Sequence, residues 1–156
     1  MIRHMWDFFR NFAPHLIYTH TRIHTYAQRI NIRKNKYMVT TEELIDLVVE
    51  GIQEKKGHSI TVADLSNIVS APAEAFVICT ANNPSQVDSI IDSIENVTRM
   101  KGDERPSAIA GRENALWVAM DYGNVMVHVF TPDTREYYDI DNLWSDAQIT
   151  IVPDLD

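Results

Sequence analysis

The sequence lacks a second cysteine, a membrane-length apolar run and an internal repeat. Cys79 has no possible partner in the chain, so a disulfide framework is excluded. It lies in the apolar run Phe76–Cys79, where we expect a small buried side chain rather than a reactive thiol, because a reactive thiol needs exposure and a nearby cation. The longest apolar runs have only the length of a strand, so we predict no membrane span.

Basic residues are scarce in most of the chain. Residues 39–156 carry seven lysines and arginines against twenty-one acidic residues, a net charge of −14, whereas residues 1–38 carry seven against one, a net charge of +6. A body this acidic would repel a phosphate backbone, so we expect it not to bind nucleic acid directly. It would attract a basic protein, and ribosomal proteins are the most abundant of these.

A length of 156 residues with 45% apolar residues suits one domain with a single core. We expect that domain to span residues 39–153, with residues 1–38 as an N-terminal extension. The extension has the Arg-rich, acid-poor composition of an organelle transit peptide, while a disordered tail or a mis-assigned start before Met38 fits as well. His20 and His24 are spaced like two metal ligands on a helix, but no cysteine or carboxylate nearby completes a site, and we predict no metal.

Two amphipathic helices are predicted. Thr40 and Glu43 form a capping box ahead of a helix over Thr41–Lys56, whose apolar residues recur at helical spacing. Gly51 lies on the inner face of this helix, where it either marks close packing against another element or is simply tolerated. Asn83 as N-cap and Pro84 at the first helical position open a second helix, which ends at Gly102.

Branched and aromatic residues predict five strands: Ile60–Leu65, Phe76–Thr80, Leu116–Asp121, Val125–Phe130 and Ile149–Val152. The third and fourth form a hairpin across Gly123-Asn124, a pair that tolerates positive φ. Residues 101–114 form a loop or a short irregular strand, and a third helix is predicted over Thr134–Leu143. The order of the elements predicts a single α/β domain in which about three helices flank a mixed sheet.

Several motifs of this chain closely resemble the ribosomal silencing factor family, also called the Iojap family. The most specific are W-x-x-x-D-Y-G, V-H-x-F and R-x-Y-Y followed by L-W, at Trp117–Gly123, Val127–Phe130, Arg135–Tyr138 and Leu143-Trp144. The resemblance extends from Thr40 to about Ala147. It implies a five-stranded mixed sheet with flanking helices, similar to nucleotidyltransferases in topology but without a known activity.

The same resemblance implies a function. Members of this family dock on the large ribosomal subunit through a basic ribosomal protein at the face where the small subunit joins, block that joining and so repress translation. It implies no enzyme activity and no cofactor, and it makes a homodimer plausible, although the acidic surface argues weakly against tight self-association. We expect a cytoplasmic protein, or an organellar one if the basic extension is a leader.

Six residues are predicted to bind the partner: Trp117, Asp121, Tyr122, His128, Arg135 and Tyr138. Aromatic residues and arginine beside carboxylates are typical of recognition surfaces. Trp117 and Asp121 share one face of their strand, so they either face outward or lie under the third helix. His128 is either a hydrogen-bonded structural residue or part of the surface, and Arg135 either pairs with a carboxylate such as Asp139 or faces the partner.

An enzymatic alternative uses Asp64, Asp121 and His128 around Mg²⁺ for nucleotidyl or phosphoryl transfer. Such chemistry needs carboxylates clustered on neighbouring strands and a phosphate-binding loop. The sequence has no Gly-rich phosphate loop and no D-x-D pair within a predicted strand, so this alternative is the weaker one.

Overall fold

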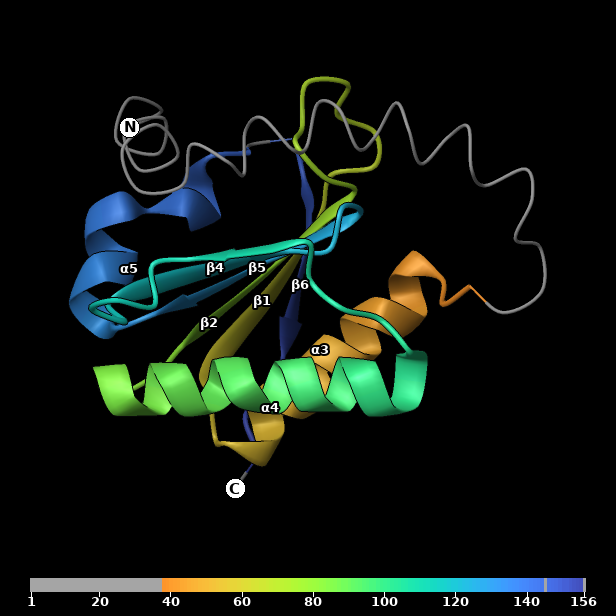
Figure 1. Ribbon diagram of the computed structural model, residues 1–156. Helices are drawn as coiled ribbons and strands as arrows, with labels where there is room; N and C mark the ends of the chain where they lie inside the picture. Colours follow the sequence, from red (N-terminus) through yellow and green to blue (C-terminus); the bar gives the residue numbers. More distant parts are fainter. Residues whose placement is uncertain (1–37, 145, 156) are drawn as a thin grey trace.

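Six strands form one mixed sheet, in the order β3-β4-β5-β2-β1-β6, in the computed structural model, which describes residues 38–144 and 146–155 (Figure 1). The strands are β1 (His58–Asp64), β2 (Ala75–Thr80), β3 (Ala108–Ala110), β4 (Trp117–Asp121), β5 (Val125–Phe130) and β6 (Gln148–Val152). Only β2 and β5 pair in parallel in this sheet; the other neighbours are antiparallel. The predicted fold class, a mixed sheet with three flanking helices, is confirmed.

The sheet has one strand more than predicted. β3 lies within residues 101–114, which were expected to be a loop or a short irregular strand, and it pairs with β4. Its three residues are too few to produce a recognisable alternation of apolar and polar side chains.

Helices α3 (Thr41–Glu54) and α4 (Pro84–Gly102) cover one face of the sheet (Figure 1). The predicted capping box is present, because Glu43 N donates to Thr40 Oγ1 at 3.1 Å and Thr40 N donates to Glu43 Oε2 at 2.8 Å. Asn83 caps α4 by accepting from Gln86 N. A Cβ at Gly51 would lie 2.7 Å from the Cα of Ile94, so this glycine marks the close approach of the two helices.

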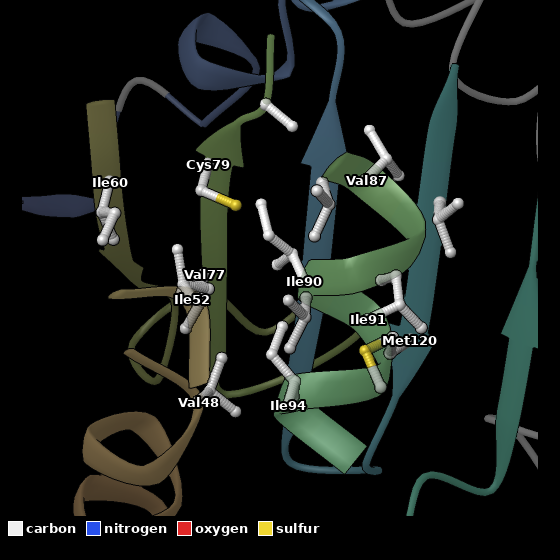
Figure 2. Packing of buried hydrophobic residues seen from close by; sticks show 14 of the residues in the cluster. Val48, Ile52, Ile60, Val77, Cys79, Val87, Ile90, Ile91, Ile94 and Met120 are labelled. Atoms are coloured by element: carbon white, nitrogen blue, oxygen red, sulfur yellow. The ribbon is translucent and has the colours of Figure 1, made fainter. Parts of the chain in front are cut away.

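The main core lies between these helices and the sheet. Figure 2 shows Val48 and Ile52 of α3 and Ile90 and Ile94 of α4 packed against the strands, all of them fully buried. Cys79 of β2 belongs to this cluster, and burial raises the pKa of its thiol to about 12. The expectation of a small buried side chain at Cys79 is confirmed.

A second core covers the opposite face of the sheet, beneath α5 (Pro132–Tyr138) and the 3₁₀ turn η1 (Ile140–Asn142). The prediction of one helix over Thr134–Leu143 is wrong at both ends. Pro132 starts the helix two residues earlier, and Asp139 breaks it by adopting a left-handed conformation with φ of 49°. Because both faces of the sheet are covered, every residue of β4 and β5 is buried.

Candidate partner-binding surface

Trp117 and His128 lie in the second core and not on the surface. Both are buried, and the indole Nε1 of Trp117 donates to Nδ1 of His128 at 3.2 Å. Burial lowers the pKa of His128 to about 3, so this imidazole is neutral near pH 7. The structural interpretation of both residues is correct, and the expectation that they face a partner is corrected: the strand face that would have been outward is covered by α5.

Asp121 and Tyr122 hold the hairpin turn. Asp121 is 1% exposed, and its Oδ1 accepts from the backbone N–H of Gly123 at 2.7 Å, which fixes the turn. Tyr122, predicted to bind the partner, is half-buried, and its hydroxyl lies 3.0 Å from Oγ1 of Thr98 on α4. Burial raises the pKa of Tyr122 to about 12. Asp121 is therefore a structural residue, and Tyr122 presents only part of its ring.

Arg135 is fully engaged inside the protein. Its Nε and Nη2 bind both carboxylate oxygens of Asp141, at 3.0 and 2.7 Å. Nη1 donates to the carbonyl of Ser59 and to Oγ1 of Thr80, and Nη2 donates to Oγ1 of Thr61. These contacts use all five N–H groups of the guanidinium, so Arg135 fastens α5 and η1 to β1 and β2. The carboxylate partner is Asp141 and not Asp139.

Tyr138 is the member of the predicted set that joins the second core to the surface. Its ring is half-buried and packs 4.6 Å from the ring of Trp117, while Tyr137 meets it edge-on at 5.0 Å. Tyr137 itself is 65% exposed. Exposed Leu116 lies next to the first turn of α5, because its carbonyl accepts from Oγ1 of Thr134 at 2.6 Å.

We call these residues and the acidic residues of the same helix the α5 surface: Leu116, Asp133, Glu136, Tyr137 and Tyr138. Asp133 and Glu136 are exposed, and the one cation of the helix, Arg135, is already paired. A depression of about 390 Å³ lies beside it, lined by His58, Ser59, Thr80, Pro132, Arg135, Glu136, Asp139 and Asp141. The surface therefore combines exposed aromatic and apolar groups with two exposed carboxylates, which suits a basic protein.

The six predicted residues thus do not form one surface. Trp117, Asp121 and His128 are inaccessible, Arg135 is occupied, and Tyr122 and Tyr138 belong to different cores of the sheet. Sequence reasoning missed Leu116, Asp133, Glu136 and Tyr137. The signal that could have found them is Pro132: a helix that starts there and is docked through Tyr138 must turn other side chains to solvent.

The residues of the enzymatic alternative are not assembled either. Asp64 lies on β1 and Asp121 on β4, with β2 and β5 between them. Asp64 binds the backbone N–H of Ser66, and its pKa is lowered mainly by hydrogen bonds from that residue. Among the described residues, no three His, Cys, Asp or Glu side chains lie close enough together to hold a metal ion. The geometry gives this alternative no support. His20 and His24 lie outside the described residues.

Comparison with known proteins gives consistent matches over the folded part of the chain. The family model described as "Ribosomal silencing factor during starvation" matches residues 38–156. A protein of Halalkalibacterium halodurans named ribosomal silencing factor RsfS is 36% identical over 109 residues, which cover 70% of this chain and 92% of that protein. The protein of the same name in Bacillus subtilis is 32% identical over 69% of this chain and 90% of its own length.

A solved structure supports the same relationship. The crystal structure of a protein from Chromobacterium violaceum aligns with a TM-score of 0.64 and 28% identity, and covers 72% of this chain and 92% of that one. Within the described residues, no helix has both the length and the apolar character needed to cross a bilayer.

Proposed function

Because the chain belongs to the ribosomal silencing factor family, we propose that it represses translation by binding a basic ribosomal protein on the large subunit and obstructing association with the small subunit. The family match over residues 38–156 carries this proposal. The name of the family describes a regulator and no catalyst, so we propose a binding role without a cofactor. The cytoplasm is the compartment we propose.

The charge of the domain supports a basic partner. Residues 39–156 have a net charge of −14, and three of their seven cations, Lys101, Arg112 and Arg135, are held by carboxylates of the domain itself. Arg112 alone pairs with Asp88, Asp92 and Glu95 on α4. Acidic groups on the opposite side of the sheet, such as those of α5, are therefore left to interact with a partner, and they would steer it by long-range attraction.

We propose the α5 surface as the site of contact. Tyr138 and the exposed Tyr137 supply aromatic area, and Asp133 and Glu136 supply charge. Of the residues predicted from the sequence, Tyr138 and the exposed part of Tyr122 remain contact residues in this proposal. The other predicted residues contribute to binding only indirectly. The position of α5 is held by Trp117, His128 and Arg135, and the hairpin turn is held by Asp121.

The test is sedimentation of the protein with purified large and small ribosomal subunits. We expect the wild-type protein to travel with the large subunit and to lower the fraction of joined subunits. Tyr137→Ala should weaken the interaction about tenfold, because truncating an aromatic residue that is buried at an interface costs about 1–2 kcal/mol. A protein that stays at the top of the gradient and leaves joining unchanged contradicts the proposal.

A pair of charge reversals separates local contact from general attraction. Glu136→Lys lies on the α5 surface, while Asp46→Lys makes the same charge change at an exposed position of α3, on the other face of the sheet. We expect Glu136→Lys to weaken docking about tenfold and Asp46→Lys to have a several-fold smaller effect. If both substitutions weakened docking equally, the α5 surface would not be the site of contact, although the protein could still bind the large subunit elsewhere.

A further inference from the structure

A second depression, of about 540 Å³, lies along the solvent-facing side of α4. It is lined by Asp92, Glu95, Asn96, Arg99, Arg105 and Pro106. The four residues from α4 follow the spacing i, i+3, i+4, i+7, so they share one face of the helix, turned away from the residues that pack on the sheet. Small-molecule sites commonly have volumes of about 300–1,000 Å³. The α5 surface lies on the other face of the sheet, so the two sites are separate (Figure 1).

The loop after α4 forms the other side of this depression. Asp103 ends the helix in a left-handed conformation with φ of 52°, and its N–H donates to the carbonyl of Thr98. Further along the loop, the N–H and the hydroxyl of Ser107 both donate to the carbonyl of Asp121, at 2.7 and 2.9 Å. The loop is therefore fastened at both ends, which holds Arg105 beside the helix.

The carboxylates and the arginines of this depression differ in their partners. Asp92 and Glu95 are bound by Arg112, at 2.5 and 3.3 Å. In the described part of the chain, neither Arg99 nor Arg105 forms an ion pair with a carboxylate. Two guanidinium groups that line the same depression repel each other, and an anion placed between them would turn this repulsion into attraction.

We propose that this depression binds a nucleoside monophosphate. The phosphate lies between Arg99 and Arg105, because guanidinium groups bind phosphate oxygens through pairs of N–H groups. Asn96 accepts from Nη2 of Arg99 at 3.2 Å through its Oδ1, so its amide N–H groups are left to donate to the ligand. At the other end, the ribose hydroxyls donate to Asp92 and Glu95, as they do to the acidic residue of dinucleotide-binding domains.

Both parts of the ligand are needed in this arrangement. Inorganic phosphate would contact the arginines and leave most of the depression empty, whereas a nucleoside without phosphate would leave the two guanidinium groups unpaired. The site includes none of the residues of the enzymatic alternative, Asp64, Asp121 and His128, so the proposal concerns binding and not catalysis.

Isothermal titration calorimetry of the full chain tests the site, with adenosine monophosphate as the ligand. We expect one molecule to bind per chain, at least tenfold more tightly than either inorganic phosphate or adenosine. Arg99→Gln and Arg105→Gln should each weaken binding at least tenfold. Lys55→Gln removes the same charge at an exposed site after α3 and should leave binding unchanged. Urea unfolding of each variant checks that its fold is intact.

Three results would overturn the proposal. They are no heat of binding up to about 5 mM adenosine monophosphate, inorganic phosphate binding as tightly as the nucleotide, and folded arginine variants that bind the nucleotide as the wild type does. The ribosomal proposal does not depend on this site. Arg105→Gln that no longer binds the nucleotide but still sediments with the large subunit would support a nucleotide site that is separate from the α5 surface.

Discussion

At the scale of single residues, the family motifs in this chain serve mainly to build the second core. Trp117 donates to His128, Asp121 fixes the turn, and Arg135 joins four segments of the chain. Motif residues that suggested a recognition surface in the sequence are instead the supports of such a surface. A sequence shows which residue types occur together, but the same polar side chains form hydrogen bonds inside a protein and across an interface. The residue types alone therefore do not distinguish a structural role from a binding role.

Arg135→Lys should destabilise the fold. Lysine can replace the charge but not the fork that binds Asp141 through two atoms while also reaching Ser59 and Thr80. We expect the free energy of unfolding to fall by about 2 kcal/mol, measured by urea denaturation. Arg105→Lys, at an exposed site, should change it by less than about 0.5 kcal/mol. Equal losses would mean that the contacts of Arg135 add nothing to stability.

His128 should make the fold sensitive to acid. Its folded-state pKa of about 3 lies below the ordinary value of 6.5, so the unfolded chain takes up a proton first and stability falls as the pH drops from about 6.5 toward 3. One such proton contributes a slope of up to about 1.4 kcal/mol per pH unit. His128→Gln should be less stable at pH 7 but show a shallower slope between pH 6 and 4 in urea unfolding. Parallel slopes for the two proteins would show that His128 is not the group responsible.

At the scale of elements, the close contact of α3 with α4 depends on one missing side chain. Gly51→Ala would normally stabilise a helix by up to about 1 kcal/mol, because alanine has the higher helix propensity. Here the added Cβ would meet the backbone of Ile94 at 2.7 Å, and we expect a net loss of about 1–3 kcal/mol in unfolding free energy. Ser89→Ala, at an exposed site of α4, should be neutral or slightly stabilising. A more stable Gly51→Ala protein would show that the helices can separate without cost.

The elements also show how far a sequence can predict a fold. The capping box, the Asn83 cap and the hairpin were predictable, because each depends on residues a few positions apart. The break at Asp139 was not, since nothing in the residue type requires a left-handed conformation, which aspartate adopts here with local hydrogen bonds to Arg135 and Asn142. Whether Trp117 is covered was likewise undecidable from its strand, because it depends on where α5 docks on the sheet.

At the scale of the whole molecule, charge should control how fast the protein finds its partner. The acidic domain attracts a basic partner over distances that salt shortens. Raising the salt concentration from about 50 to about 300 mM should lower the association rate with the large subunit roughly tenfold and change the dissociation rate much less. Stopped-flow measurements with a labelled protein provide both rates. An association rate independent of salt would show that the net charge of −14 does not contribute to binding of the large subunit.

The attachment of α5 has a consequence for genetics. This helix has no fully buried side chain of its own, so its position depends on Arg135 reaching Thr61 and Thr80 on strands that the α5 surface does not include. Alleles that impair translational control should therefore appear not only at exposed positions of the helix but also at threonines in the interior of the sheet. In a screen, such alleles would look like unrelated stability defects until a compensating change at Arg135 or Asp141 connected them.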